Sequence, residues 1–351
     1  MFKKKSLISI VIPAAVLLAS CGANFQSVEN FSKTRKIVEQ ASNDFAEDIY
    51  QSCLRRTRYV NLVANNGIST RNTLRESCET TERPDSEKFK SAVSILINYM
   101  EALGAIASGK DLSLDNSIEN LGQSIKDFSI RGEKPNANVV EGGSQILKVL
   151  SDLVTKKIRG NALQKAIVCT NEPIHKYVTG NSVPATDQNG FDLYEPATGG
   201  LTFIVEDNYI KGTLRIEADA INNYYEDYFL ILNKLDAPKI NQSNYQLFVD
   251  QITVGDRLTA DYNKSLEIVA EKEQAARAYN QILLNTVGTH NKLRKEFEEG
   301  VKPQDIERLC QVNAKVSFKK IDDEKMKRIQ KILNEYVASV KPLVEQVDRA
   351  F

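Results

Sequence analysis

The sequence predicts an all-α protein, in which long antiparallel helices form an elongated bundle with one irregular excursion near residues 181–212. Apolar residues recur three or four positions apart along most of the chain, which is the period of an amphipathic helix. Glycine and proline are sparse, with 17 and 9 copies in 351 residues. As a single helix, the segment 243–298 would extend about 84 Å, and helices of that length pack at shallow angles.

Three apolar stripes locate the most regular helices, at residues 89–107, 279–297 and 326–343. Pro342 lies within the third stripe and is expected to kink or end that helix, because proline lacks an amide donor and its ring clashes with the preceding turn. Together with the turn signals, the stripes predict helices near residues 27–62, 70–82, 85–108, 115–129, 138–179, 213–234, 243–298, 302–319 and 323–349. Connectors are expected at 65–70, 131–138 and 236–243, and the second of these is a candidate boundary between two parts of the chain.

One region breaks the helical pattern. Residues 181–200 contain two prolines and three glycines and carry no apolar stripe. The next stretch, 201–216, is compatible with the start of a helix or with a short β-hairpin that turns near Asp207 and Asn208. Because a long loop inside a compact domain is uncommon and often functional, we expect an ordered excursion that presents its side chains to a partner.

The N-terminus has the three parts of an export signal. Three lysines at positions 3–5 precede a mostly apolar run at 7–18, and two small residues then lead to Cys21. The run is too short for a transmembrane helix, which needs roughly 20 apolar residues. Residues 1–20 are therefore expected to be a signal peptide.

The residues Leu18-Ala19-Ser20-Cys21 resemble the bacterial lipobox, and the resemblance covers residues 1–21 only. It implies that Cys21 is acylated and becomes the new N-terminus, with 21–30 as a tether and 31–351 as the helical mature domain. Two or three acyl chains anchor firmly, because each buried methylene contributes about 0.8 kcal/mol. In this family an aspartate after the cysteine often retains the protein in the inner membrane. Gly22 stands there instead, so the resemblance favours a cell-envelope protein on the outer membrane, facing the periplasm.

The charge balance argues against nucleic acid as a partner. The chain has 46 basic and 46 acidic side chains, and removal of the signal lysines leaves a small acidic excess. No basic surplus exists to bind a phosphate backbone.

The four remaining cysteines, Cys53, Cys78, Cys169 and Cys310, are expected to form two disulfides in an exported protein. Of the three pairings, geometry favours Cys53 with Cys78, because they are nearly equidistant from a turn at residues 65–67. Cys169 with Cys310 follows by elimination. No histidine stands in a recognisable partnership with any of them, so a cysteine nucleophile is not expected.

Two patterns resemble metal sites without completing them. Glu172 and His175 have the Glu-x-x-His spacing of di-iron bundles, but no second pair exists, since Val287 precedes His290 by three positions. Residues 187–192 place oxygen ligands before a glycine but lack the full alternation of a calcium loop. We therefore expect no metal and no cofactor. His290 lies in an apolar stripe and is expected to form a core hydrogen bond with Thr286 or a tyrosine.

Aromatic residues supply the candidate partner-binding set, because tyrosine combines a large apolar face with a polar tip and is frequent at interfaces. Tyr225 and Phe229 are expected in the core. The proposed partner-binding residues are Phe191, Tyr194, Tyr224 and Tyr228.

These observations predict a membrane-anchored extracytoplasmic lipoprotein without enzymatic activity, with a protein-binding or envelope-assembly role. Two alternatives stay open, a ligand-binding lipoprotein with a cavity between helices and a protective immunity or phage-exclusion lipoprotein. No phosphate-binding loop, Gly-x-Ser-x-Gly elbow or zinc motif is present to support an enzyme. Carboxylates such as Glu226 and Asp227 are the remaining catalytic candidates. The sequence does not indicate an oligomeric state.

Overall fold

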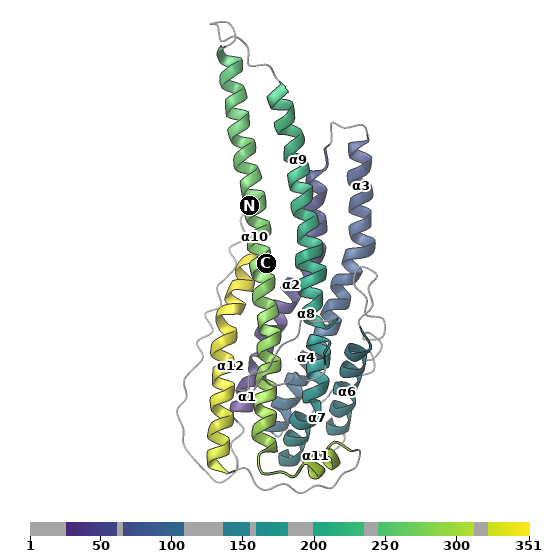
Figure 1. Ribbon diagram of the computed structural model, residues 1–351, viewed down its shortest axis with the longest axis vertical. Helices are drawn as coiled ribbons and strands as arrows, with labels where there is room; N and C mark the ends of the chain where they lie inside the picture. The colour runs from purple at the N-terminus through teal and green to yellow at the C-terminus, as the bar shows by residue number, and fades with distance from the viewer. Residues whose placement is uncertain are drawn as a thin grey trace.

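The computed structural model describes residues 26–61, 66–108, 136–154, 159–181, 199–234, 245–311 and 322–351. Every regular element among these residues is a helix, which confirms the all-α prediction. The long helices run close to the long axis of an elongated molecule (Figure 1). The expected helix at 115–129, the connector at 131–135 and the segment before Gln26 lie outside the described residues.

The first predicted helix is divided in two. α1 (Gln26–Lys33) and α2 (Arg35–Arg56) meet at Thr34, whose hydroxyl donates to the carbonyl of Phe31 at 2.6 Å. A short 3₁₀ turn, η1 (Thr57–Tyr59), then ends the helix, and Val60 is extended. The prediction of one helix over 27–62 is therefore wrong at both Thr34 and Val60.

The next two predicted helices are one continuous run. α3 (Gly67–Ser77) passes through a π-helical turn, η2 (Cys78–Glu82), into α4 (Arg83–Ser108). The amide of Arg83 bonds to the carbonyl of Cys78, five residues back, so the missing amide of Pro84 falls at the junction between two helix types. This is why Pro84 does not separate the two helices.

The predicted helix 138–179 is an adjacent pair, α6 (Ala137–Val154) and α7 (Arg159–Thr179). Gly142 on α6 sits so close to α7 that an added Cβ would lie 2.5 Å from the carbonyl oxygen of Pro173. The small residue lets the two helix backbones approach each other.

The segment after the irregular region is helical. α8 (Leu201–Phe203), the π-helical segment η3 (Ile204–Leu214) and α9 (Arg215–Lys234) follow without a break. The β-hairpin alternative for 201–216 is therefore wrong, and the helix alternative is confirmed. The irregular excursion does not extend to residue 212, because Leu201, Val205, Tyr209 and Leu214 are buried on a helical surface.

The C-terminal part contains α10 (Tyr245–Glu298), α11 (Pro303–Leu309) and α12 (Asp323–Ala350). The expected helix 302–319 ends at Leu309. α12 does not end at Pro342, because Val344 and Val347 beyond it are buried and hold the last turns on the core.

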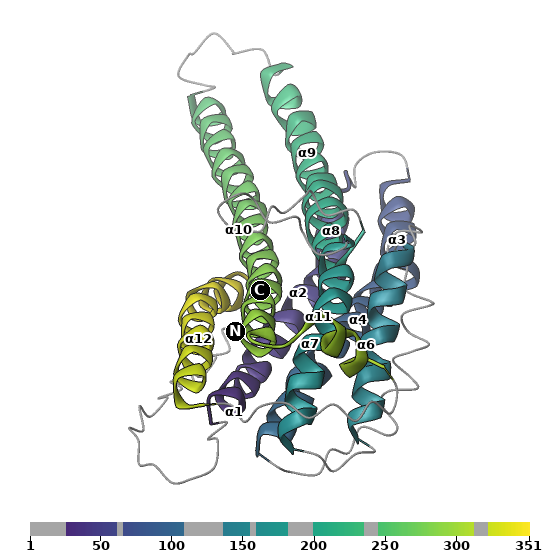
Figure 2. The same cartoon turned by 60° about the horizontal axis from the view of Figure 1, so that its bottom comes forward.

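One large hydrophobic core joins most of these helices, and a small separate cluster is formed by Tyr50, Cys53 and Cys78. Phe45 stacks on Tyr279 at a ring-centroid distance of 4.9 Å and meets Tyr209 at 4.8 Å and Phe89 at 5.1 Å. The C-terminal part of α9 and the first part of α10 project beyond the rest of the bundle as an antiparallel hairpin (Figures 1 and 2). Within the described part of the chain, no helix is long and apolar enough to cross a bilayer.

Candidate functional site

An open groove lies between the two helices of the projecting hairpin. It has a volume of about 470 Å³ and is lined by Asn222, Tyr225, Glu226, Phe229, Leu230 and Tyr262. Two helices packed as a hairpin bury one face against each other, and all the residues that line the groove belong to α9 and α10, which extend side by side (Figure 1).

Aromatic side chains form the floor of the groove. Tyr225 is buried, and its ring lies 5.4 Å from Tyr262 and 6.4 Å from Phe229 between centroids. The Tyr262 hydroxyl donates to the Oδ1 atom of Asn222 at 3.0 Å, which connects α10 to α9. Leu230 is 48% exposed at the edge, so an apolar side chain is available to a partner.

The groove lies in an acidic part of the chain. Residues 219–267 contain eight carboxylates and four cationic side chains. Glu226 lines the groove, and Asp227 beside it is exposed. The sequence that forms the two helices therefore carries a surplus of negative charge, and one of its carboxylates lines the groove.

The structure places the predicted partner-binding tyrosines beside the groove. Tyr224 and Tyr228 are half-buried and their rings are 4.9 Å apart, while Tyr59 contacts Tyr224 from η1 at 5.9 Å. Burial, with a hydrogen bond that Tyr224 donates to Tyr228, raises the pKa of Tyr224 to about 12. Tyr225 is a core residue as expected, but Phe229 is only half-buried and lines the groove, because α9 projects beyond the core at that turn.

Phe191 and Tyr194 lie outside the described residues, as do Cys21 and residues 187–192. Tyr262, Asn222 and Leu230 were not singled out from the sequence. Tyr262 is 37 positions from Tyr225, and no period in the sequence links α10 to α9 in this way.

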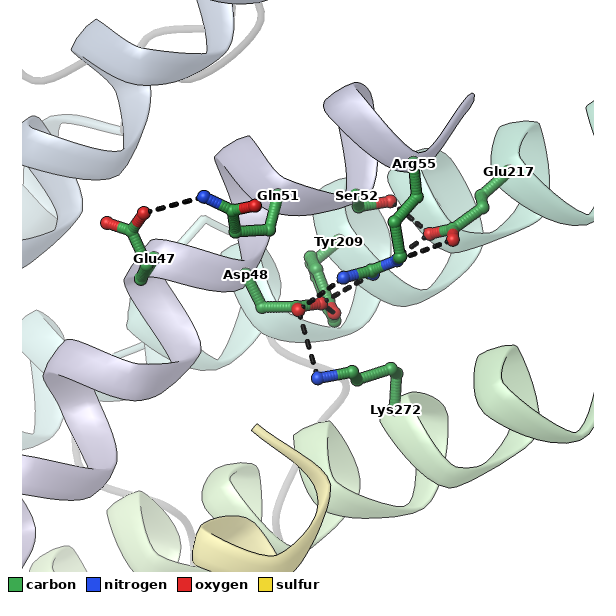
Figure 3. Close-up of polar contacts among 8 residues, drawn as sticks. All are labelled: Glu47, Asp48, Gln51, Ser52, Arg55, Tyr209, Glu217 and Lys272. Atoms are coloured by element: carbon green, nitrogen blue, oxygen red, sulfur yellow. Dashed lines mark hydrogen bonds and ion pairs between the residues drawn. The ribbon is translucent and has the colours of Figure 1, made fainter. Parts of the chain in front are cut away.

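A cluster of charged and polar side chains, separate from the groove, is buried at the base of the projecting hairpin (Figure 3). Arg55 on α2 binds Asp48 through Nη1 at 2.7 Å and Nη2 at 2.9 Å, and binds Glu217 on α9 through Nε at 2.6 Å. Lys272 on α10 reaches Asp48 at 3.1 Å, and the hydroxyl of Tyr209 donates to the same carboxylate. The cluster joins α2, η3, α9 and α10 by charge-assisted hydrogen bonds.

The charges in this cluster are balanced and paired. Burial by itself raises the pKa of Asp48, but hydrogen bonds and charge from Arg55 and the charge of Lys272 outweigh it and hold the pKa below its usual value. Burial lowers the pKa of Lys272, against the attraction of Asp48. Burial and the Asp48 charge raise the pKa of Tyr209 well above its usual value. Every charged group in the cluster is paired, and none lines the groove. We therefore interpret the cluster as contacts that hold the four elements together, and not as an acid–base pair.

His290 lies in the core, where the sequence predicts it. Its Nε2 atom is 2.6 Å from the hydroxyl of Tyr99 and its Nδ1 atom is 3.1 Å from Oδ1 of Asn171. The predicted tyrosine partner is confirmed, whereas Thr286 pairs with the hydroxyl of Tyr336 at 3.0 Å. Burial lowers the pKa of His290 to about 3, so the ring is neutral.

Glu172 and His175 do not face a common ligand. Glu172 pairs with Lys176 at 2.9 Å on the surface of α7. His175 is buried, and its Nδ1 atom lies 3.0 Å from the carbonyl oxygen of Asn181 and 3.1 Å from the hydroxyl of Thr179. Glu172 is exposed and His175 is buried, so the two side chains do not converge on a common site.

Both predicted disulfides are present. Cys53 and Cys78 are bonded with Cα atoms 5.6 Å apart, and Cys169 and Cys310 with Cα atoms 5.3 Å apart. Asn66 turns the chain between the first pair in a left-handed conformation, at φ 70°. Glu82 lies within 4.8 Å of both sulfurs of that pair. However, Arg56 donates to Cys53 at 2.9 Å and to Glu82 at 3.1 Å, so a cation already occupies this position and the three groups do not fit a metal ion.

No protein-family model, curated protein or solved structure matches this chain in the comparisons made. The groove, the buried charges and the core therefore stand as the basis for a functional conclusion.

Proposed function

We propose that this protein is a lipid-anchored lipoprotein of the bacterial envelope that binds another protein through the groove between α9 and α10. The lipobox at Cys21 supports the anchor and the export, and two disulfides are in keeping with an oxidising compartment. The groove is the observation that carries the binding role. It offers an aromatic floor and an exposed leucine on a part of the molecule that projects away from the core.

The shape of the groove favours a helical segment of the partner. A third amphipathic helix laid between α9 and α10 would bury the open face in the same way as a bundle helix does. Its apolar residues at three- and four-residue spacing would contact Tyr225, Phe229 and Leu230. Its flanking lysines or arginines would meet the surplus of carboxylates at 219–267.

Site-specific photo-crosslinking in intact cells tests this proposal. A photoreactive amino acid at position 230 of the full chain is expected to crosslink one envelope protein, at a segment with helical apolar spacing and basic flanks. Position 252 provides the matched control, because Ile252 is equally exposed, at 49%, on the same hairpin but does not line the groove. Leu230→Asp should reduce partner recovery at least 10-fold without lowering the melting temperature, since burial of an unpaired carboxylate in an apolar interface costs roughly 2 kcal/mol or more of binding free energy.

Equal crosslinking from positions 230 and 252, or full partner recovery by Leu230→Asp, would contradict binding at the groove. A volume of about 470 Å³ also falls within the range of small-molecule pockets. A ligand that raises the melting temperature of the wild type but not of Leu230→Asp, without any protein crosslink, would replace the protein partner by a small molecule.

A further inference from the structure

The end of the α2–α3 hairpin carries an unusual distribution of charge. Residues 49–75 contain five arginines and no lysine, aspartate or glutamate. Arg55 is neutralised by Asp48 and Glu217, and Arg56 by Glu82. Three arginines remain at the end of the hairpin, and we call them, together with Ile68, the arginine tip: Arg58, Ile68, Arg71 and Arg75.

The guanidinium groups of the arginine tip have no carboxylate at salt-bridge distance within the described part of the chain. Arg71 is held in place, because its Nε atom donates to the carbonyl of Thr57 at 2.9 Å and its Nη2 atom to that of Arg58 at 3.4 Å. These bonds fix the side chain and leave its charge unneutralised. Glu79, one turn beyond Arg75 on the same helical run, is bound by Arg83 at 2.7 Å, and Arg75 acts on it only from beyond salt-bridge distance.

Ile68 adds an apolar element to this positive surface. It is 68% exposed in the first turn of α3, more than the other large apolar side chains that stand out from the described surface. Arg71 follows it one turn later, so an isoleucine and an arginine occupy the same side of the helix. Transfer of the exposed isoleucine side chain out of water is favourable in free energy.

We propose that the arginine tip binds the anionic surface of a phospholipid bilayer. Guanidinium groups pair with lipid phosphates through charge-assisted hydrogen bonds, and each basic side chain near an anionic bilayer strengthens binding. Ile68 would enter the boundary between head groups and acyl chains, which a soluble polyanion could not offer. The exposed isoleucine is the reason for choosing a bilayer over an anionic polymer.

The arginine tip and the start of the described chain lie at opposite ends of the bundle (Figure 1). α1 and α2 together contain 30 residues, which corresponds to a separation of about 45 Å at ~1.5 Å per residue. The arginine tip is thus far from α1, the first described helix that follows Cys21 in the sequence. It also does not depend on the groove, because the groove residues belong to α9 and α10.

An environment-sensitive fluorescent amino acid at position 68 of the full chain tests the assignment locally. With vesicles of phosphatidylethanolamine and phosphatidylglycerol we expect a blue shift that weakens with added salt, and no shift with phosphatidylcholine alone. The same fluorophore at position 252, another exposed apolar site, should show no shift. This readout reports the surroundings of residue 68 itself and not those of the N-terminal segment.

The charge contribution is tested by the double variant Arg58→Gln/Arg75→Gln. We expect the lipid concentration at half-maximal shift to rise on the order of 30-fold for two lost cationic groups. Arg215→Gln/Arg277→Gln is the matched control, because it removes two charges from side chains that are 77% and 52% exposed elsewhere on the surface, and it should change this concentration less than about 2-fold.

Three outcomes would overturn the assignment. The first is the same shift with phosphatidylcholine alone, and the second is an equal effect of the two double variants. The third is tight binding of dextran sulfate or cell-wall polymer with no blue shift from any vesicle, which would assign the arginine tip to a soluble polyanion. Circular dichroism and the melting temperature show whether each variant folds. If Arg58→Gln/Arg75→Gln does not fold, the comparison of the fluorophore at position 68 with that at position 252 tests the proposal instead.

Discussion

Many of the polar side chains in the core of this protein have specific hydrogen-bond partners. Tyr99 and Asn171 satisfy the two ring nitrogens of His290, and the Tyr177 hydroxyl donates to the carbonyl of Ala92 at 2.7 Å. Asp48 receives hydrogen bonds from Arg55 and Tyr209. Such pairing is required, because a buried polar group without a partner costs roughly 1–3 kcal/mol of unfolding free energy.

His290 makes the free energy of unfolding depend on pH. Its pKa is about 3 in the folded protein against 6.5 when unperturbed, so the unfolded state binds more protons between these values. Stability therefore rises with pH through this window and falls on acidification, by about 2 kcal/mol from this group between pH 7 and 5. In His290→Gln, the difference in unfolding free energy between pH 7 and 5 should shrink by that amount, as measured by urea denaturation.

The comparison between the two pH values is made within each protein, so a constant loss of stability in His290→Gln does not affect it. An unchanged pH dependence in the variant would mean that His290 is protonated in the folded core, against the burial described here.

At the scale of the elements, the helices are shaped by residues that disturb regular α-helix. A π-helical turn precedes Pro84, and a longer π-helical segment, η3, places Tyr209 against Asp48. π-Helical turns are rare in proteins overall, but those that occur are often found at functional sites. Here η3 aligns α9 with the buried charges at the base of the projecting hairpin.

Two glycines in helices give a matched pair of substitutions. Gly142→Ala places a Cβ 2.5 Å from the Pro173 carbonyl oxygen and 2.9 Å from the Tyr177 amide nitrogen, both backbone atoms, so α6 and α7 must separate. We expect a loss of about 2 kcal/mol or more in unfolding free energy. Gly255→Ala meets nothing within 4 Å on α10, and alanine in a helix interior should stabilise by about 0.5–1 kcal/mol.

Denaturant unfolding of both variants measures the two effects. Equal changes of the same sign would show that helix propensity alone, and not the contact between α6 and α7, determines the result.

At the scale of the whole molecule, the core and the two disulfides stabilise one part of the chain more than the rest. The loops closed by Cys53–Cys78 and Cys169–Cys310 span 25 and 141 residues. In the chain-entropy account they contribute about 3.5 and 5 kcal/mol, respectively. The outer half of α10 falls within the second loop but extends away from the core, and Ile252 and Val254 there are exposed at 49% and 46%.

The rate of amide hydrogen exchange should differ between the two halves of α10, although α10 is one helix of 54 residues. Amides at 276–293 lie in the core, so they should exchange on the order of 10-fold or more slowly than those at 250–264, where most side chains are exposed. Mass spectrometry of peptides from each half measures this. Uniform protection along α10 would indicate that the projecting hairpin is covered, for example by a partner in its groove.

The sequence by itself determined the features that depend on neighbours along the chain. Apolar spacing predicted the helical class and most helices, because a buried helix face repeats every three or four residues. The symmetry of Cys53 and Cys78 about the turn at Asn66 predicted their pairing, since an antiparallel hairpin brings equidistant residues together. The tyrosine partner of His290 followed from the need to satisfy a buried ring.

The tertiary structure alone decided what depends on residues far apart in the chain. Whether residues 201–216 form a helix or a hairpin was set by burial of Tyr209 and Leu214 against other helices, because both local conformations suit the same residues. The groove needs Tyr262 beside Tyr225, and the buried charges need Asp48 beside Glu217 and Lys272. No period in the sequence encodes these encounters, since they arise only when separate helices pack around one core.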